Sequence, residues 1–142
     1  MADILLVYWS GTGNTEIMAE KIKEGLEGAG ASVDYKKVDE IEPKEALKYD
    51  RIVFGCPSMG VELLEEDEFE PFFEEMENQL NGKKVALFGS YGWGEGEWMD
   101  EWINRINQSG AVLYETGLKV NSTPSSEEEE TCIQFGEGFA KF

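Results

Sequence analysis

Short apolar runs alternate with amphipathic stretches along nearly the whole chain. The runs at 4–9, 51–55 and 84–89 are continuously apolar, which is typical of parallel strands covered on both faces of a sheet. Shorter runs predict two further strands, one at 32–35 and one at 111–114 with a continuation at 118–120. The pattern therefore predicts five strands.

The stretches between these runs repeat apolar residues at helical spacing. The four apolar faces are Met18, Ile22, Leu26 and Ala29; Phe69, Phe72, Phe73, Met76 and Leu80; Trp98, Trp102 and Ile106 with Ile103 beside them; and Cys132, Phe135 and Phe139. Residues 127–130 are acidic, as favoured in the first turn of the last helix. Strands alternating with helices predict a three-layer α/β/α sandwich around a five-stranded parallel sheet. We expect one domain spanning residues 1–142, since no linker or repeat interrupts the pattern.

Composition adds a strong negative charge, because 30 Asp and Glu outnumber 12 Lys and Arg and leave a net charge of −18. This balance argues against nucleic acid or an anionic membrane as partner, and it favours basic proteins or simply high solubility. The chain has no histidine, so Ser-His and Cys-His mechanisms are excluded and we expect no metal site. Cys56 and Cys132 form no Cys-x-x-Cys pair, and no signal peptide or membrane-length apolar run is evident. Free thiols and a cytoplasmic location are therefore expected.

The most informative motif is Ser10-Gly11-Thr12-Gly13-Asn14-Thr15, between the first apolar run and the first helix. Its glycines allow a tight turn, and the helix start presents unpaired N–H groups at the positive end of the helix dipole. Hydroxyl and amide side chains complete a cradle of neutral donors suited to a phosphate. The alternative is a turn whose hydroxyls only cap the helix, but three hydroxyls and an amide exceed that need. The motif lacks the Gly-Lys-Ser/Thr ending of a P-loop, and Glu16 replaces the third glycine of a dinucleotide fingerprint, so we expect a single phosphate group.

Ligands of such folds bind beyond the carboxyl ends of the strands, so the segments after the other strands matter as well. These segments are Pro57-Ser58-Met59-Gly60-Val61-Glu62, Ser90-Tyr91-Gly92-Trp93-Gly94-Glu95-Gly96 and Asn121-Ser122-Thr123-Pro124. Met59 and Trp93 stand beside glycines, where a large apolar side chain is poorly placed to join the core. They either plug the surface, contact a partner, or flank a flat ring, and the phosphate cradle at the same edge favours the ring. Trp98 and Trp102, four residues apart, are expected in the core.

These loops and strands together resemble the short-chain flavodoxins over nearly the whole chain, with matching segments at 7–15, 55–60, 70–72 and 86–94. The resemblance implies strand order 2-1-3-4-5 and a non-covalently bound FMN at the switch point. It assigns the FMN phosphate to residues 10–15 and the two sides of the flavin ring to Met59 and Trp93. It places Glu62 near the flavin N3–H and the Gly60 carbonyl near N5. The remaining contacts that it implies come from Pro57, Ser58, Val61, Ser90, Tyr91, Gly92, Gly94, Asn121 and Ser122.

Val61 departs from the family pattern, which more often has a small or acidic residue there. In a four-residue turn from Met59 to Glu62, a β-branched residue resists the positive φ that a type II turn needs at its third position. Gly60 accepts the positive φ that a type II′ turn needs at its second position. We therefore expect Val61 to favour the geometry that turns the Gly60 carbonyl toward N5 and so to stabilise the semiquinone.

The resemblance implies a low-potential one-electron carrier that cycles mainly between neutral semiquinone and hydroquinone, and not an enzyme. Nine of the sixteen residues from Glu62 to Glu77 are acidic and none is basic. Such carboxylates disfavour an anionic reduced flavin and steer basic redox partners, namely reductases and oxidoreductases. The same run also fits a solvated helix face. We expect transient partners and a monomer.

Three other functions are compatible with parts of this pattern. A flavin reductase using a quinone or a nicotinamide would need cationic residues near the ring loops and extra length, and both are lacking. A phosphorylated signalling receiver needs acidic residues at strand ends, where this chain has Trp9, Ser10, Gly55 and Cys56. A redox-inactive module that stores flavin stays open. Cys56 is expected to be a small buried core residue.

Overall fold

A six-segment parallel sheet forms the centre of the computed structural model, which describes residues 1–60 and 62–142. Its strands are β1 (Ile4–Tyr8), β2 (Val33–Lys37), β3 (Arg51–Gly55), β4 (Lys84–Tyr91), β5 (Val112–Leu113) and β6 (Leu118–Asn121). All five strand pairings are parallel, and the order β2-β1-β3-β4-β5 confirms the predicted order 2-1-3-4-5.

The fifth position of the sheet is shared by two segments. β5 pairs with the start of β4, at Lys84 and Val85, and β6 pairs with its second half, from Phe88 to Tyr91. Between them the chain passes through Glu115 and Gly117, whose φ angles are 53° and 82°. This edge of the sheet is therefore interrupted. The strand predicted at 111–114 has only two residues in the structure, Val112 and Leu113.

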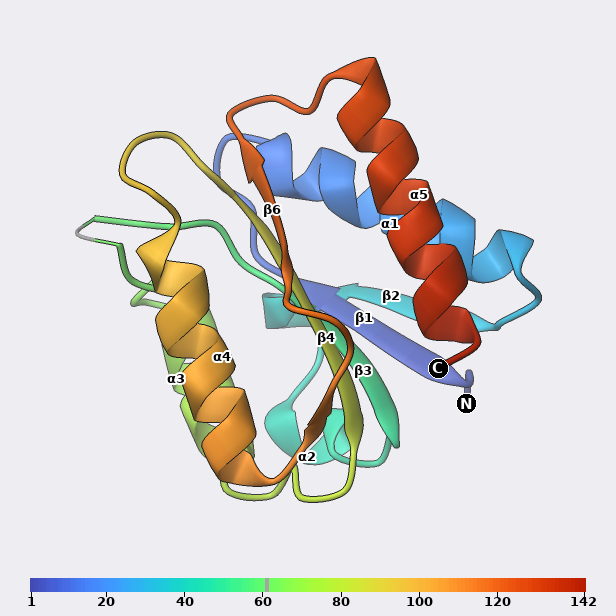
Figure 1. Cartoon of the computed structure of the whole chain (residues 1–142). Coiled ribbons are helices and arrows are strands. Elements are labelled where there is room, and N and C mark those ends of the chain that lie inside the picture. The colour runs from blue at the N-terminus through green and yellow to red at the C-terminus, as the bar shows by residue number, and fades with distance from the viewer. Residues whose placement is uncertain (61) are drawn as a thin grey trace.

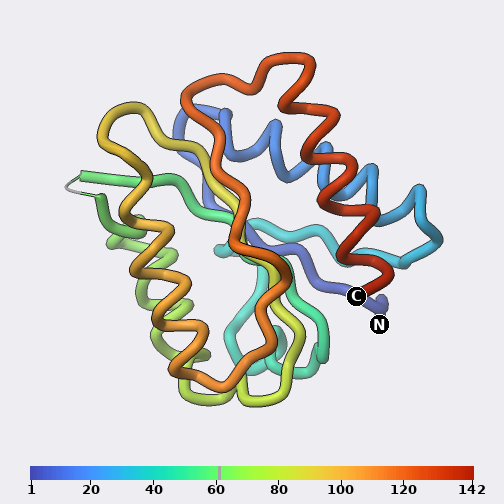
Figure 2. The backbone as a smooth tube through the Cα atoms, viewed as in Figure 1, coloured from blue at the N-terminus to red at the C-terminus, as the bar shows by residue number. Residues whose placement is uncertain are grey.

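Helices cover both faces of the sheet, which confirms the three-layer prediction (Figure 1). They are α1 (Asn14–Gly28), α2 (Pro43–Ala46), α3 (Phe69–Glu77), α4 (Glu97–Ser109) and α5 (Ser126–Ala140), with a short 3₁₀ segment η1 (Val38–Glu40). Figure 1 shows α1 and α5 on one face and α3 and α4 on the other. In the trace of Figure 2 the two chain ends lie toward the same end of the sheet, where Lys84 at the start of β4 donates to the Phe142 carbonyl at 2.9 Å.

The continuous apolar runs are buried on both sides, as the sequence predicted. Along β1, Leu5 and Val7 pack into the core beneath α3 and α4, while Ile4 and Leu6 pack into the core beneath α1 and α5. Trp98 and Trp102 are each 1% exposed, so their predicted core role is confirmed.

Several element boundaries differ from the sequence prediction. β1 ends at Tyr8, so Trp9 belongs to the following loop, and β4 extends through Ser90 and Tyr91, which were expected in a loop. α3 ends at Glu77, and Leu80 is fully buried beyond it. The short elements η1 and α2 were not predicted, because three or four residues are too few for a helical period to show.

The helices on each face are joined by specific contacts. Gly136 of α5 lies against α1 so closely that a Cβ there would overlap the carbonyl oxygen of Ile22. On the other face, Arg105 of α4 donates to both carboxylate oxygens of Glu70 at 2.7 Å and to those of Glu77 at 2.9 Å, both on α3. These contacts fix the helices whose first turns border the loops described next.

Candidate functional site

The carboxyl ends of β1, β3, β4 and β6 meet at one edge of the sheet, because all four strands are parallel (Figure 1). A cavity of about 210 Å³ lies between the segments that leave these strands. Ten of the predicted site residues line it, and they come from all four segments. They are Gly11, Thr12, Asn14, Pro57, Ser58, Met59, Ser90, Tyr91, Gly92 and Ser122.

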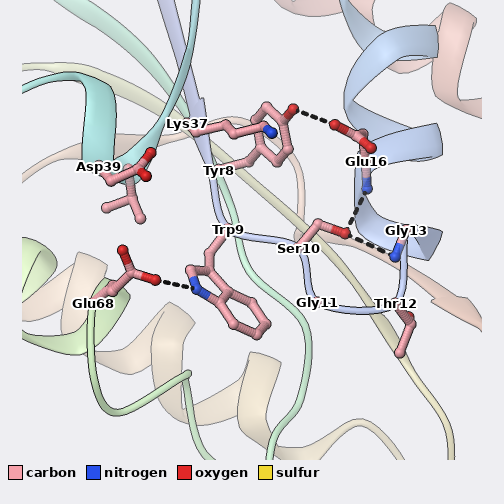
Figure 3. Close-up of a pocket in the computed structure, with 11 residues that line it drawn as sticks. Tyr8, Trp9, Ser10, Gly11, Thr12, Gly13, Glu16, Lys37, Asp39 and Glu68 are labelled. Atoms are coloured by element: carbon pink, nitrogen blue, oxygen red, sulfur yellow. Dashed lines mark hydrogen bonds between the residues drawn. The ribbon is translucent and has the colours of Figure 1, made fainter.

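The loop after β1 presents neutral donors to this cavity. Ser10 Oγ accepts the backbone N–H groups of Gly13 and Glu16, each at 3.2 Å, so Ser10 acts as the cap of α1 (Figure 3). The N–H groups of Asn14 and Thr15 lie in the first turn, where no acceptor exists inside the helix. The Thr12 side chain is exposed beside them. Capping therefore uses Ser10, and the N–H groups of Asn14 and Thr15 have no acceptor within α1, as is typical of anion sites at helix starts.

Thr15 lies behind the cavity rather than in its wall. Its hydroxyl is 2.8 Å from the hydroxyl of Ser90 and accepts the Ser90 backbone N–H at 3.3 Å. Thr15 and Ser90 are 1% and 5% exposed, respectively. The two hydroxyls thus connect the start of α1 to the end of β4 inside the protein.

The segment after β3 forms a hairpin closed by Met59 and Leu63. Met59 N–H donates to the Leu63 carbonyl at 2.7 Å, and Leu63 N–H donates to the Met59 carbonyl at 2.9 Å. Met59 therefore pairs with Leu63, the residue after Glu62, with which the turn considered from the sequence ends. Gly60 and Glu62 both have positive φ, of 54° and 53°. Val61 lies outside the described residues, so its expected influence on this turn stays a prediction.

Glu62 contacts the loop after β4. Its Oε1 accepts the N–H groups of Gly96 and Glu97 at 3.1 and 3.0 Å, at the start of α4. The carboxylate therefore ties the 59–63 hairpin to the segment that carries Trp93. The second oxygen, Oε2, is not engaged by these two bonds.

Met59 and Trp93 are both exposed at the carboxyl edge of the sheet, in the segments that follow β3 and β4. Met59 is 38% exposed and lines the cavity, whereas Trp93 is 67% exposed and does not line it. Gly60, Glu62 and Gly94 also stand outside the lining. The structure thus brings the two apolar side chains to one edge of the sheet, and their contact with a ring stays a prediction.

The segment after β6 completes the wall. Asn121 is the last residue of β6, not a loop residue, and Ser122 lines the cavity with φ of 62°. Thr123 donates its hydroxyl to Asn14 Oδ1 at 3.0 Å, which joins this segment to the loop after β1.

Trp9 is a lining residue that sequence reasoning missed. It lies directly after β1 and continues the first apolar run of the sequence, so the pattern predicts a strand residue at this position. One feature of the sequence could have identified Trp9 as a lining residue. It directly precedes Ser10, so it lies where the strand ends and the loop begins.

A second cavity, of about 400 Å³, lies on the β2 side of the same loop (Figure 3). Ser10 and Gly13 line it together with Trp9, and so do the charged residues Glu16, Lys37, Asp39 and Glu68. Tyr8 donates its hydroxyl to Glu16 at 2.9 Å there, and burial raises the pKa of Tyr8.

Cys56 is fully buried at the end of β3, as expected. Burial raises the pKa of the Cys56 thiol, so the group is protonated at neutral pH. Within residues 1–60 and 62–142, no group of three His, Cys, Asp or Glu is arranged to hold a metal ion. No helix in the same residues is long and apolar enough to cross a membrane.

Comparison with known proteins gives consistent matches over nearly the whole chain. The Flavodoxin family model matches residues 6–136. A flavodoxin of Clostridium beijerinckii is 50% identical over 135 residues, which cover 95% of this chain and 97% of that protein. A flavodoxin of Megasphaera elsdenii is 46% identical over 136 residues, covering 96% and 97%. The solution structure of two-electron reduced Megasphaera elsdenii flavodoxin has a TM-score of 0.87 at 45% identity, over 98% of this chain and 99% of that one.

Proposed function

The chain belongs to the flavodoxin family of FMN-binding electron-transfer proteins, and from that membership we propose that it passes single electrons between redox proteins. In finer detail, we propose that it works at the low-potential couple between half-reduced and fully reduced FMN. The observation that carries the proposed role as an FMN-dependent carrier is a single cavity. Four segments that follow strands meet around it, and one of them, the loop after β1, offers neutral hydrogen-bond donors. FMN supplies the reversible one-electron chemistry when it is bound.

The loop after β1 fits the phosphate of FMN. Two first-turn N–H groups, of Asn14 and Thr15, have no acceptor within α1, and the positive end of the helix dipole lies at the same place. Thr12 and Ser58 add hydroxyls to the cavity wall. Among the described residues no Lys or Arg lines this cavity, so the phosphate would be held by dipoles and hydrogen bonds.

Ring binding is proposed for the open side of the cavity. At about 210 Å³ the cavity is smaller than the roughly 300 Å³ at which small-molecule pockets begin, so it suits the polar tail of FMN better than the whole cofactor. We assign the two sides of the ring to Met59 and Trp93, whose exposed side chains offer a sulfur and an aromatic face. Glu62 Oε2 is the acceptor we assign to the flavin N3–H, because Oε1 is committed to α4.

The acidic surroundings favour a low potential, but fewer carboxylates contribute than the sequence count suggested. Glu70 and Glu77 are paired with the positive charge of Arg105, which compensates much of their negative charge. The carboxylates left on the two ring-side segments include Glu62, Glu66, Asp67, Glu95 and Glu97.

Each of these charges opposes a further negative charge on the ring. One carboxylate at ~10 Å in water contributes about 0.4 kcal/mol before salt screening. Several carboxylates beside apolar walls shift a one-electron potential by on the order of 100 mV.

The same charges would act on partners. With a net charge of −18, the protein attracts redox proteins that carry basic surfaces, and this attraction raises the encounter rate in a salt-dependent way. We propose transient complexes, a monomeric carrier built as one domain over residues 1–142, and a cytoplasmic location.

Anaerobic stepwise reduction of the FMN-loaded protein, followed by visible absorbance, tests the proposal. We expect the yellow form to pass through a long-lived blue form before bleaching, because one electron is taken up at a time. Direct bleaching in a single two-electron step would contradict a one-electron carrier. Failure of the protein to bind FMN at all would contradict the site assignment.

A further inference from the structure

Trp9 is held in place from two sides (Figure 3). Its indole Nε1 donates a hydrogen bond to Glu68 Oε1 at 3.0 Å, across 59 positions of sequence. Its ring lies directly against Gly11, where a Cβ would stand 2.8 Å from Trp9 Cη2. The Trp9 backbone N–H donates to the Gly55 carbonyl of β3 at 3.0 Å. Gly11 has no positive φ that requires glycine, so the closeness of the indole explains the absence of a side chain there.

The indole stands between two cavities. Trp9, Gly11 and Thr12 line both the cavity of about 210 Å³ assigned to the FMN tail and the cavity of about 400 Å³ on the β2 side. The second cavity is lined by the carboxylates of Glu16, Asp39 and Glu68 and by the ammonium group of Lys37. Trp9 and its loop are therefore shared by the proposed anion site and a cavity whose charged lining is mainly acidic.

Glu68 is itself fixed by a buried neighbour. The Glu65 carboxylate, in a residue 6% exposed, accepts the backbone N–H groups of Asp67, Glu68 and Phe69, each at 2.8 Å. This arrangement sets the chain at the start of α3 and brings the Glu68 side chain to Trp9.

We propose that Trp9 is a positioning residue of the cofactor site and that Glu68 is the group that holds it there. The hydrogen bond between Glu68 and Trp9 holds the indole in contact with Gly11 and so fixes the conformation of the phosphate loop. The indole also lies between the cavity assigned to the FMN tail and the one that Glu16 and Asp39 line. This inference rests on the proposed function, because it concerns the binding of FMN. Since the indole contacts the phosphate loop, the pair affects FMN more than riboflavin, which lacks the phosphate.

The first test compares Glu68→Ala with Glu68→Gln. Both substitutions remove the negative charge, but only Gln retains an oxygen that can accept the Trp9 N–H. Dissociation constants of the apoproteins for FMN and for riboflavin are measured by quenching of flavin fluorescence. We expect Glu68→Ala to bind FMN about three- to tenfold more weakly than Glu68→Gln, the range of one hydrogen bond, with a smaller difference for riboflavin. Equal FMN affinities of the two variants would overturn the proposal.

Removing the donor provides the second test. In a Trp9→Phe background no N–H remains for either side chain, so the difference between Ala and Gln at position 68 should disappear. Glu66→Ala is the charge control, since Glu66 is exposed in the same segment. A difference between Ala and Gln that persists in Trp9→Phe would also overturn the proposal.

Thermal unfolding of each apoprotein separates positioning from folding. A merely structural role would lower the melting temperature of Glu68→Ala and leave the ratio of FMN to riboflavin affinity unchanged. If the wild-type protein binds no FMN, the proposed function fails and this inference fails with it. If the wild type binds FMN and the Ala and Gln variants do not differ, this inference alone fails.

Discussion

Thr15 and Ser90 are 75 positions apart in sequence, and their hydroxyl oxygens meet at 2.8 Å inside the protein. Thr15 begins the helix that follows the phosphate loop, and Ser90 lies just before Tyr91, Gly92 and Trp93 in the ring-side segment. The contact thus connects the two ends of the proposed cofactor site through buried hydroxyls.

Ser90→Ala is expected to lower the free energy of unfolding, because it leaves the buried Thr15 hydroxyl without that partner. Thr15 Oγ1 still accepts the backbone N–H of residue 90 in this variant, so the expected loss is that of one hydrogen bond, about 0.5–1.5 kcal/mol. Thr15→Val removes both hydrogen bonds and should lose more, and the double variant should lose less than the sum of the two. Urea unfolding of the four apoproteins measures this coupling. Additive losses would show that the two hydroxyls act independently.

Glu62→Ala is expected to destabilise the start of α4 and to loosen the Trp93 segment. Its carboxylate accepts the Gly96 and Glu97 N–H groups, and losing such a cap costs about 0.5–2 kcal/mol. Glu62→Gln keeps an acceptor oxygen and should lose less. Urea unfolding measures the stability of each variant. Comparison with Trp93→Phe shows which part of the fluorescence comes from Trp93, and a change in that part reports the loosening of its segment. Glu95→Ala serves as the matched charge control, and an equal loss in that variant would contradict the capping role.

Gly136→Ala is expected to force α1 and α5 apart. The added Cβ overlaps the Ile22 carbonyl oxygen, and overpacking of this kind costs about 1–3 kcal/mol. Gly28→Ala is the matched control in α1, because nothing lies within 4 Å of a Cβ at that position. There the same substitution should be neutral or slightly stabilising, since alanine favours helix. Thermal unfolding of both variants should therefore give shifts of different size or sign.

The pair of Tyr49 and Asp34 predicts a stability that depends on pH at both extremes. Tyr49 donates its hydroxyl to Asp34, and this hydrogen bond lowers the pKa of Asp34. Burial, together with the Asp34 contact, raises the pKa of Tyr49 to about 12. The folded state thus favours an ionised Asp34 and a neutral Tyr49.

Wild type should therefore exceed Tyr49→Phe in stability by a constant amount between about pH 4 and pH 10, the ordinary pKa values of the two groups. The excess falls below that window as Asp34 takes up its proton, and above it as Tyr49 loses its own. Urea unfolding across the pH range gives the difference. In an Asp34→Asn background the acid-side fall should be absent, and its persistence would show that another carboxylate is responsible.

Sequence reasoning predicted the fold well because the continuous apolar runs of β1, β3 and β4 record burial on both faces of the sheet. It also predicted which segments meet, because parallel strands bring their carboxyl ends to one edge. It missed contacts between side chains far apart in sequence. Nothing in the chain order indicates that Thr15 faces Ser90, or that Glu68 reaches Trp9.

The acidic run from Glu62 to Glu77 illustrates the same limit. A composition count treats its nine carboxylates as one solvated surface. In the structure Glu65 caps the start of α3, Glu70 and Glu77 bind Arg105, and Glu68 binds Trp9. Identical side chains in one run therefore have separate roles, which depend on partners contributed by other elements.

The interrupted strand beside β4 has a consequence for how the molecule behaves in crowded solution. A sheet edge that offers a long, regular row of free backbone groups can recruit another chain into a growing ladder. Here one edge is broken between Leu113 and Leu118, and the opposite edge, β2, carries exposed Lys36 and Lys37. Neither border offers a flat apolar template, so copies of this small carrier can collide often without joining edge to edge into fibrils.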